Sequence, residues 1–204
     1  MSKHSRYRWI AGLLALSGCW DSVAMPIRIA SDGGGGALGM DDGGNSDRDA
    51  AVDERGVPDT LHCAPVADWP EEWVEAERAL FEAINALRAT RPRCGSRGFE
   101  DLEPLRFAPG LRCSARLHSR DMDIRDFFDE TNPDGETPKE RIAEAGYRYR
   151  WAEESIVSGG NDHALVLVNL RENWDDCLNL FNPDYSAVGI GLHKGRWTLD
   201  FAGP

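Results

Sequence analysis

The sequence lacks the short motifs that mark the best-known catalytic and nucleotide-binding sites. It contains no GxSxG, no HExxH, no P-loop and no pair of cysteines spaced as CxxC. These absences remove the motif evidence for a serine hydrolase, a zinc protease, a P-loop enzyme and a zinc knuckle. The glycine run at 33–36 follows no predicted strand, so we do not interpret it as a phosphate-binding loop.

Basic residues are also scarce. Lysine and arginine number 23 against 35 aspartates and glutamates, which gives a formal net charge of -12. Nucleic-acid binding needs a basic face, and electrostatic docking on anionic lipid needs basic clusters. We therefore expect neither. The histidines form no recognisable catalytic triad and are expected in the signal segment, the linker, helix packing or the surface. They are His4, His62, His118, His163 and His193.

No apolar run near the N-terminus is long enough to span a bilayer. The short run Trp9–Leu16 follows a basic segment and precedes small residues, which predicts a secretory signal peptide over residues 1–18. The quartet Leu16–Cys19 resembles a bacterial lipobox, whose cysteine becomes the first mature residue and carries lipid. We expect secretion across the inner membrane, with Cys19 lipid-anchored at the envelope, on the outer membrane or cell surface.

Residues 19–62 have almost no aromatic or β-branched content and are rich in glycine and aspartate. Such a segment buries too little apolar surface to offset the entropy of ordering it. Its Asp-Gly steps do not match the spacing of an EF-hand loop. The composition predicts an acidic, flexible tether between the anchor and a folded domain over residues 63–204.

The folded region begins with helices and ends with a strand pair. Apolar residues at helical spacing predict a first helix from about Glu71 that Pro92 ends, and a second helix over 111–128. Thr137 and Glu140 predict a capping box at the start of a short helix. The remaining elements are expected as a strand over 147–157, a helix over 162–173, a turn or short helix over 174–185, and two strands over 186–201. This order favours an α+β fold rather than repeated βαβ units.

Four cysteines remain after Cys19, enough for two disulfides in an oxidising compartment. Cys63 and Cys94 flank the first helix, and on that ground we expect them to pair. The pairing requires the Cys63 segment to fold back along the helix.

Carboxylates follow aromatic residues in three separate segments. Glu130 follows two phenylalanines, Glu153 and Glu154 follow Trp151, and Asp175 and Asp176 follow Trp174. If acids from the three segments cluster in a buried site, their pKa values would be raised or they would bind a cation. The alternative is three ordinary exposed acids.

Seven segments between Glu77 and Phe201 together resemble the CAP superfamily of cysteine-rich secretory, antigen 5 and pathogenesis-related proteins, in its bacterial secreted branch. In order, they are INALRA, LHSRDM, FFDETNPDG, RIAEAGY, AEESIVSG, NWDDCLNLFNPDYSAVGIG and RWTLDF. The resemblance implies a three-layer α-β-α sandwich around a small mixed or antiparallel sheet. It also implies a disulfide between Cys113 and Cys177.

The resemblance places the family's cavity on three of these acids. Two histidine positions of the cavity fall on Glu130 and Asp176, and its glutamate falls on Glu154. The family's cavity can hold a divalent cation, and three carboxylates would favour calcium or magnesium over zinc. The alternative is a cavity that has decayed into an inert surface.

The missing histidines remove the obvious general base near neutral pH. We therefore expect a non-catalytic, monomeric binding module that uses Glu130, Glu154 and Asp176 to bind a protein, a lipid or a wall glycan. The alternative is a hydrolase of glycans or peptides, in which Glu130 and Glu154 lie about 5–10 Å apart in one cleft. Trp197 and Phe201 are expected in the core of the last strand.

Overall fold

The structure is a computed structural model that describes residues 56–204. The predicted signal peptide, Cys19 and most of the predicted tether lie outside the described residues. The helices are η1 (Ala64–Val66, a 3-10 turn), α1 (Glu71–Arg88), α2 (Pro109–Ile124), α3 (Pro138–Glu144), α4 (His163–Glu172) and α5 (Trp174–Leu180). The strands are β1 (Arg93–Cys94), β2 (Arg97–Gly98), β3 (Arg106–Phe107), β4 (Trp151–Ser158), β5 (Ala187–His193) and β6 (Arg196–Gly203). None of the helices within residues 56–204 is long and apolar enough to cross a membrane.

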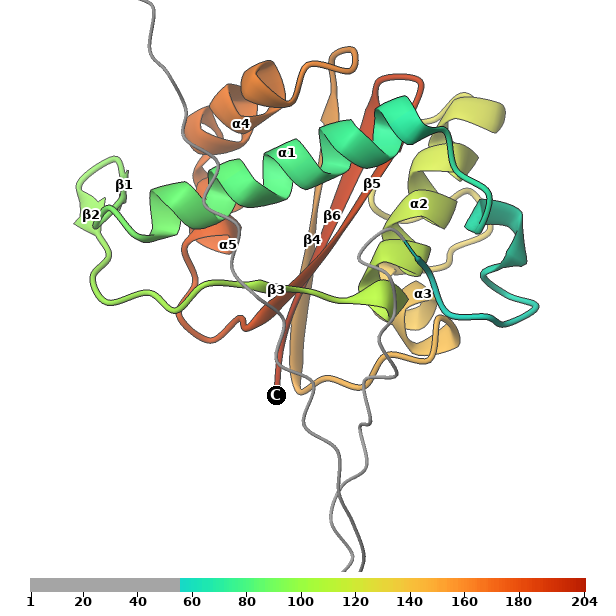
Figure 1. The fold of residues 1–204 in the computed structure, drawn as a ribbon, viewed down its shortest axis with the longest axis horizontal. Coiled ribbons are helices and arrows are strands. Elements are labelled where there is room, and N and C mark those ends of the chain that lie inside the picture. Colours follow the sequence, from blue (N-terminus) through green and yellow to red (C-terminus); the bar gives the residue numbers. More distant parts are fainter. Residues whose placement is uncertain (1–55) are drawn as a thin grey trace, which may run out of the picture. The chain divides into compact units, whose positions relative to one another are not determined.

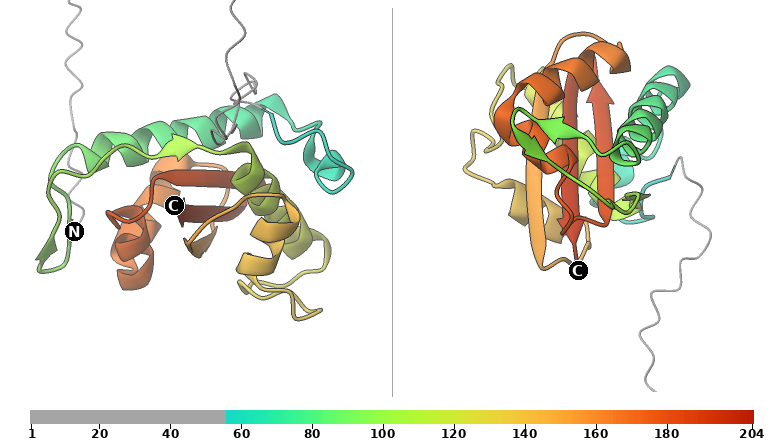
Figure 2. Two further views of the ribbon diagram at one scale, coloured as in Figure 1. Left: turned by 90° about the horizontal axis from the view of Figure 1, so that it is seen from below. Right: turned by 90° about the vertical axis from the view of Figure 1, so that its left-hand side faces the viewer.

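A four-stranded sheet in the order β3-β5-β6-β4 forms the middle layer (Figure 1). The short β3 pairs with β5 in parallel, and the other pairs are antiparallel, so the sheet is mixed as expected. Helices α4 and α5 cover one face and α2 and α3 cover the other, while α1 runs along the edge of the sheet beside β5 and shares a core with α4 and α5 (Figure 2). The α+β class and the three-layer sandwich are therefore confirmed.

Alternating residues of β5 and β6 build the main core against α1, α4 and α5. Trp197 and Phe201 are fully buried there, which confirms their predicted place. The indole Nε1 of Trp197 also donates a hydrogen bond to the carbonyl of Gly160, at 2.7 Å. The buried polar end of this large side chain is thereby satisfied.

On the opposite face, α2 lies directly against the backbone of β5. A Cβ added at Gly189 would stand 2.0 Å from the backbone of Leu111, and one at Gly191 would stand 2.4 Å from that of Ala115. Only glycine permits so close an approach. The helix ends at Ile124, one turn earlier than predicted, because Asp126 adopts a positive φ of 53° and turns the chain into the following loop.

Two polar residues near the end of α1 hold neighbouring loops by their backbone. The Asn85 side chain accepts a hydrogen bond from the backbone N–H of Leu105 and donates one to its carbonyl, at 2.8 and 2.9 Å. Buried Arg88 donates to the carbonyls of Glu103 and Leu180. Both residues belong to the INALRA segment, so its polar positions stabilise the fold.

A buried carboxylate joins α1 to α2 and to the sheet. Glu77 accepts hydrogen bonds from the guanidinium of Arg116, the backbone N–H of Leu192 and the indole of Trp69. Arg112 lies 3.6 Å from the same carboxylate. Burial raises the pKa of Glu77, while the two arginines oppose that rise. Removing the carboxylate would leave buried donors without a partner, at a cost of about 3–5 kcal/mol.

The disulfides pair Cys63 with Cys113 and Cys94 with Cys177, at Cα separations of 5.6 and 5.8 Å. Both predicted pairings, Cys63–Cys94 and Cys113–Cys177, are therefore wrong. Cys63 and Cys94 lie beyond opposite ends of α1, whose 18 residues extend about 27 Å. Cys113 and Cys177 lie on helices that cover opposite faces of the sheet. The segment before α1 packs on α2 instead, and Val57 already contacts the Cys63–Cys113 cluster.

Cysteine labelling should identify this pairing. Cys113→Ser is expected to make the Cys63 thiol reactive, and Cys94→Ser is expected to do the same for Cys177. Each loss should lower the free energy of unfolding by about 2–5 kcal/mol, because the unfolded chain loses a covalent constraint. Peptide mass mapping after alkylation locates the labelled residue. A label on Cys177 in Cys113→Ser would contradict the structure.

Trp197→Ala should lower the free energy of unfolding by about 3–5 kcal/mol, because it opens a large cavity in the main core. The matched control is Trp174→Ala, since that indole is 51% exposed. Urea unfolding of both variants measures the difference. Equal losses would show that Trp197 does not have the structural role described.

Candidate functional site

The three predicted site acids do not meet in one hollow. Glu154 and Ser155 are neighbours on β4, and successive side chains of a strand point to opposite faces. The Ser155 hydroxyl hydrogen-bonds the Asp176 carboxylate on the α5 side of the sheet. Glu154 instead contacts His118 of α2 and Arg141 of α3 on the other side. The predicted grouping is therefore corrected, because β4 separates Glu154 from Asp176.

Glu154 lies in a closed polar cluster beneath α2 and α3. Arg141 Nη2 donates to both Glu154 oxygens at 2.9 Å, and the carboxylate has no exposed surface. The imidazole Nε2 of His118 lies 3.5 Å from Glu154 Oε1. Asp200 faces Glu154 across the β4–β6 ladder and is also fully buried. The cluster thus contains two carboxyls, one guanidinium and one imidazole.

Burial changes the protonation of this cluster. It raises the pKa of Asp200 to about 6, and it raises the pKa of Glu154 well above its usual range, with the neighbouring carboxyl adding to the rise. Arg141 opposes the increase at both acids. Burial, together with the charge of Arg141, lowers the pKa of His118 to about 3. The imidazole is thus neutral at pH 7, and the two coupled carboxyls retain a proton more strongly than exposed acids do.

This cluster holds the acidic loop between α2 and α3. Arg141 donates to the carbonyls of Glu130 and Glu136, at 2.8 and 3.0 Å. The neutral ring of His118 donates from Nε2 to the carbonyl of Asp129, at 3.0 Å, because that oxygen can only accept. The expected capping box also forms at the end of this loop. Glu154 therefore acts, through Arg141, as a positioning residue for the loop.

Glu130 and Asp176 do approach each other, on the other side of β4. Glu130 is exposed and Asp176 is half-buried. Partial desolvation and then the charges of Asp176 and Glu153 raise the pKa of Glu130, and partial burial raises that of Asp176. We call Glu130, Glu153 and Asp176 the acidic edge. Glu153, which follows Trp151 in the same segment as Glu154, takes the place expected for Glu154.

No group of three or more His, Cys, Asp or Glu side chains within residues 56–204 is placed to hold a metal ion. The expectation of a calcium or magnesium site therefore receives no support from the geometry. Lys139 lies 3.8 Å from Glu153 and partly neutralises the acidic edge.

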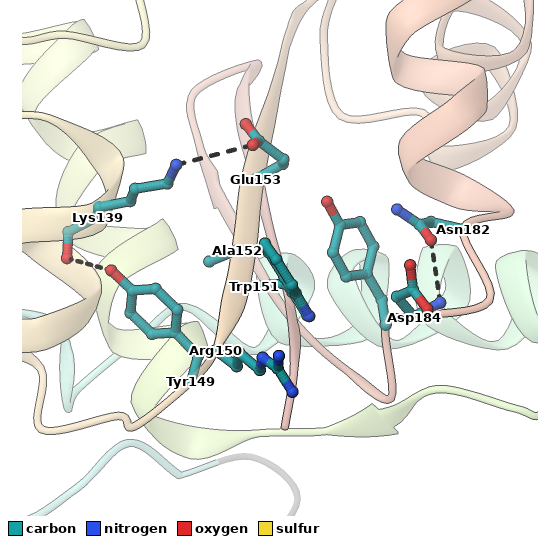
Figure 3. Close-up of a pocket in the computed structure, with 9 residues that line it drawn as sticks. Lys139, Tyr149, Arg150, Trp151, Ala152, Glu153, Asn182 and Asp184 are labelled. Carbon is teal, nitrogen blue, oxygen red and sulfur yellow. Dashed lines mark hydrogen bonds and ion pairs between the residues drawn. The ribbon is translucent and has the colours of Figure 1, made fainter.

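A pocket of about 290 Å³ adjoins the acidic edge, with Glu153 belonging to both. Trp151 lies between Lys139 and Tyr149 on one side and Asn182 and Asp184 on the other (Figure 3). The residues that line the pocket are Lys139, Tyr149, Arg150, Trp151, Ala152, Glu153, Asn182, Asp184 and Tyr185.

Sequence reasoning missed this pocket because it combines segments some 30 positions apart in the chain. The aromatic run 147–151 was the only local signal, and it is equally typical of a strand.

The pH dependence of stability should distinguish a buried, proton-retaining Asp200 from an ordinary acid. Its raised pKa contributes stability below the unfolded pKa of about 4, and this contribution is lost as the pH rises through about 6. Asn cannot ionise, so Asp200→Asn should gain up to about 3 kcal/mol relative to the parent between pH 4 and 7. Urea unfolding at each pH measures the difference.

His118 acts with the opposite sign, since stability from its lowered pKa is lost as the pH falls from about 6.5 towards 3. Because His118 is present in both proteins, comparing Asp200→Asn with the parent at each pH removes most of the contribution of His118. Asp68→Asn, at an exposed position, is the matched control and should show no such trend. A difference between Asp200→Asn and the parent that does not vary with pH would contradict the assignment.

Comparisons with solved structures find the same fold elsewhere. An extracellular protein containing an SCP domain from Bacillus anthracis str. Ames matches with a TM-score of 0.58 at 20% identity, over 64% of this chain and 41% of that one. An outer surface protein from Borrelia burgdorferi matches with a TM-score of 0.55 at 19% identity, over 63% of this chain and 92% of that one. A cysteine-rich secretory protein from Staphylococcus aureus matches with a TM-score of 0.52 at 16% identity, over 64% of this chain and 38% of that one.

Sequence comparisons give the family. The chain is 29% identical over 129 residues to the uncharacterized protein YkwD of Bacillus subtilis (strain 168), across 62% of this chain. It spans only 47% of that relative's length. The family model for CAP, the cysteine-rich secretory protein family, matches residues 81–201, more than half of the chain. The chain therefore belongs to the CAP family of cysteine-rich secretory proteins.

Proposed function

We propose that this chain is an extracellular, non-catalytic binding module whose ligand lies on the β4 face between α3 and the loop after α5. Two of its structural relatives are described as an extracellular protein and an outer surface protein, which supports a location outside the cell. Two disulfides within residues 56–204 support an oxidising compartment. We further propose that Cys19 carries lipid and that the segment after it tethers a monomeric domain to the envelope.

The observation that carries this proposal is the burial of Glu154. A carboxylate that acts as acid or base must reach the substrate or a water molecule. Glu154 has no exposed surface, and both its oxygens accept from Arg141. The Glu130–Glu154 pair required by the hydrolase alternative is therefore not available. The loss of this pair supports the binding proposal over the hydrolase alternative as it was expected from the sequence.

The binding surface combines the acidic edge with the adjoining pocket. Glu153 connects them, and its exposed carboxylate lies 3.8 Å from the Lys139 ammonium. Glu130 and Asp176 extend the surface beyond the pocket. Both remain ligand-binding residues in this proposal, whereas Glu154 supports the loop that carries Glu130.

Co-sedimentation with an envelope fraction of the source organism tests the proposal. The parent should sediment with the envelopes and release no reducing ends or free amines above the blank. Glu153→Lys should reduce the sedimented fraction several-fold, because it reverses charge where the pocket meets the acidic edge. Glu172→Lys makes the same change at an exposed position on α4 and should leave sedimentation unchanged.

Two results would contradict the proposal. Release of soluble fragments by the parent would show catalysis. Equal sedimentation of both lysine variants would place the binding surface elsewhere.

A further inference from the structure

We infer that the β4 pocket binds one unit of a neutral saccharide. The inference rests on the proposed function and names the ligand class of that site. Four features carry it: the volume of the pocket, its fixed aromatic walls, an exposed indole, and polar groups of balanced charge.

The volume limits the ligand. About 290 Å³ is near the lower end of the range of small-molecule pockets, which begins at about 300 Å³. One sugar ring is compatible with this space, whereas an extended acyl chain is not. The lining is also too polar for an acyl chain, because Ala152 is its only aliphatic residue.

Two tyrosines form walls that are already fixed. The Tyr149 hydroxyl donates to the carbonyl of Lys139 at 3.1 Å (Figure 3). The Tyr185 ring is buried and stacks on Phe201 with centroids 5.9 Å apart. Walls that need no reordering reduce the entropic cost of binding.

Trp151 supplies the exposed aromatic surface. Its side chain is 54% exposed although it begins a strand whose next residue, Ala152, is buried. A sugar ring presents C–H groups on its faces and hydroxyls around its rim. The Arg150 guanidinium lies over one face of this indole, 5.4 Å from the ring centroid. The C–H groups can pack on the other face, and an aromatic ring offers such a surface at low conformational cost.

The polar groups around the indole match a neutral, hydroxyl-bearing ligand. The cations Lys139 and Arg150 are balanced by the anions Glu153 and Asp184, so the pocket does not select a polyanion or a polycation. The Asn182 amide adds N–H donors, while its Oδ1 already accepts from the backbone N–H of Asp184 at 3.0 Å. Hydroxyl groups can donate to the carboxylates and accept from the cations, so this set can satisfy the rim of a sugar.

Isothermal titration calorimetry of the full chain with N,N′,N″-triacetylchitotriose and with maltotriose tests the inference. At least one trisaccharide should bind saturably. Trp151→Ala should weaken that binding at least tenfold, and Trp151→Phe should restore part of it. Trp174→Ala is the matched control, because its indole is 51% exposed outside the pocket, and it should bind like the parent. Urea unfolding of each variant verifies that it is folded.

The outcomes separate the ligand class from the proposed function. If neither trisaccharide binds, or if Trp151→Ala binds as the parent does, the saccharide inference is wrong. Trialanine is the comparison peptide, and its binding with the same dependence on Trp151 would identify a peptide site instead. If envelope binding through Glu153 persists in any of these cases, the binding module stands and only the ligand class fails. If neither saccharide binding nor envelope binding through Glu153 is found, the proposed function is wrong as well.

Discussion

The buried ion pair between Arg141 and Glu154 is the interaction on which the organisation around β4 depends. Two charges are expensive to bury, and the cost is recovered only where hydrogen bonds satisfy them. Here Arg141 Nη2 donates to both carboxylate oxygens and to the carbonyl of Glu130, while a second nitrogen donates to the carbonyl of Glu136. One guanidinium thereby joins α3, β4 and the loop after α2. Removing either partner would leave buried polar groups without their hydrogen bonds and release the loop.

In this arrangement one face of β4 carries the residues that stabilise the fold, and the opposite face carries the residues of the proposed binding surface. Even positions of β4 face α2 and α3, where Glu154 and Asp200 share a closed polar cluster. Odd positions face the other side, where Trp151 and Glu153 are exposed. A residue that occupies the family's glutamate position therefore stabilises the fold, and its neighbour in sequence takes part in the proposed binding surface. The functional proposal follows from this alternation, because it leaves an aromatic and polar pocket accessible and the most perturbed carboxyls inaccessible.

The polar positions within the family-like segments have mainly architectural roles in this chain. Asn85 and Arg88 hold loop backbones, and His118 holds the carbonyl of Asp129 in its neutral form. Glu77 performs the same task between α1, α2 and β5. Long buried polar side chains thus replace regular hydrogen bonding where helices and loops meet the edges of a small sheet. The family-like segments contain Asn85, Arg88 and His118 but not Glu77. A match to a pattern also does not say whether a polar group faces a ligand or the backbone.

By itself the sequence determined the longer helices and strands, and its resemblance to a family determined the fold, but the two-residue strands β1, β2 and β3 were not predicted. Helical spacing, the Thr137–Glu140 capping box and the strand pair around 193–196 were each readable because they depend on residues close together in the chain. Only the tertiary structure decided the disulfide pairing, the separation of Glu154 from Glu130 and Asp176, and the existence of the pocket. These depend on the length of α1, on which helix covers which face of the sheet, and on which face of β4 each side chain points to. Such relations join residues far apart in the chain, and no local pattern carries them.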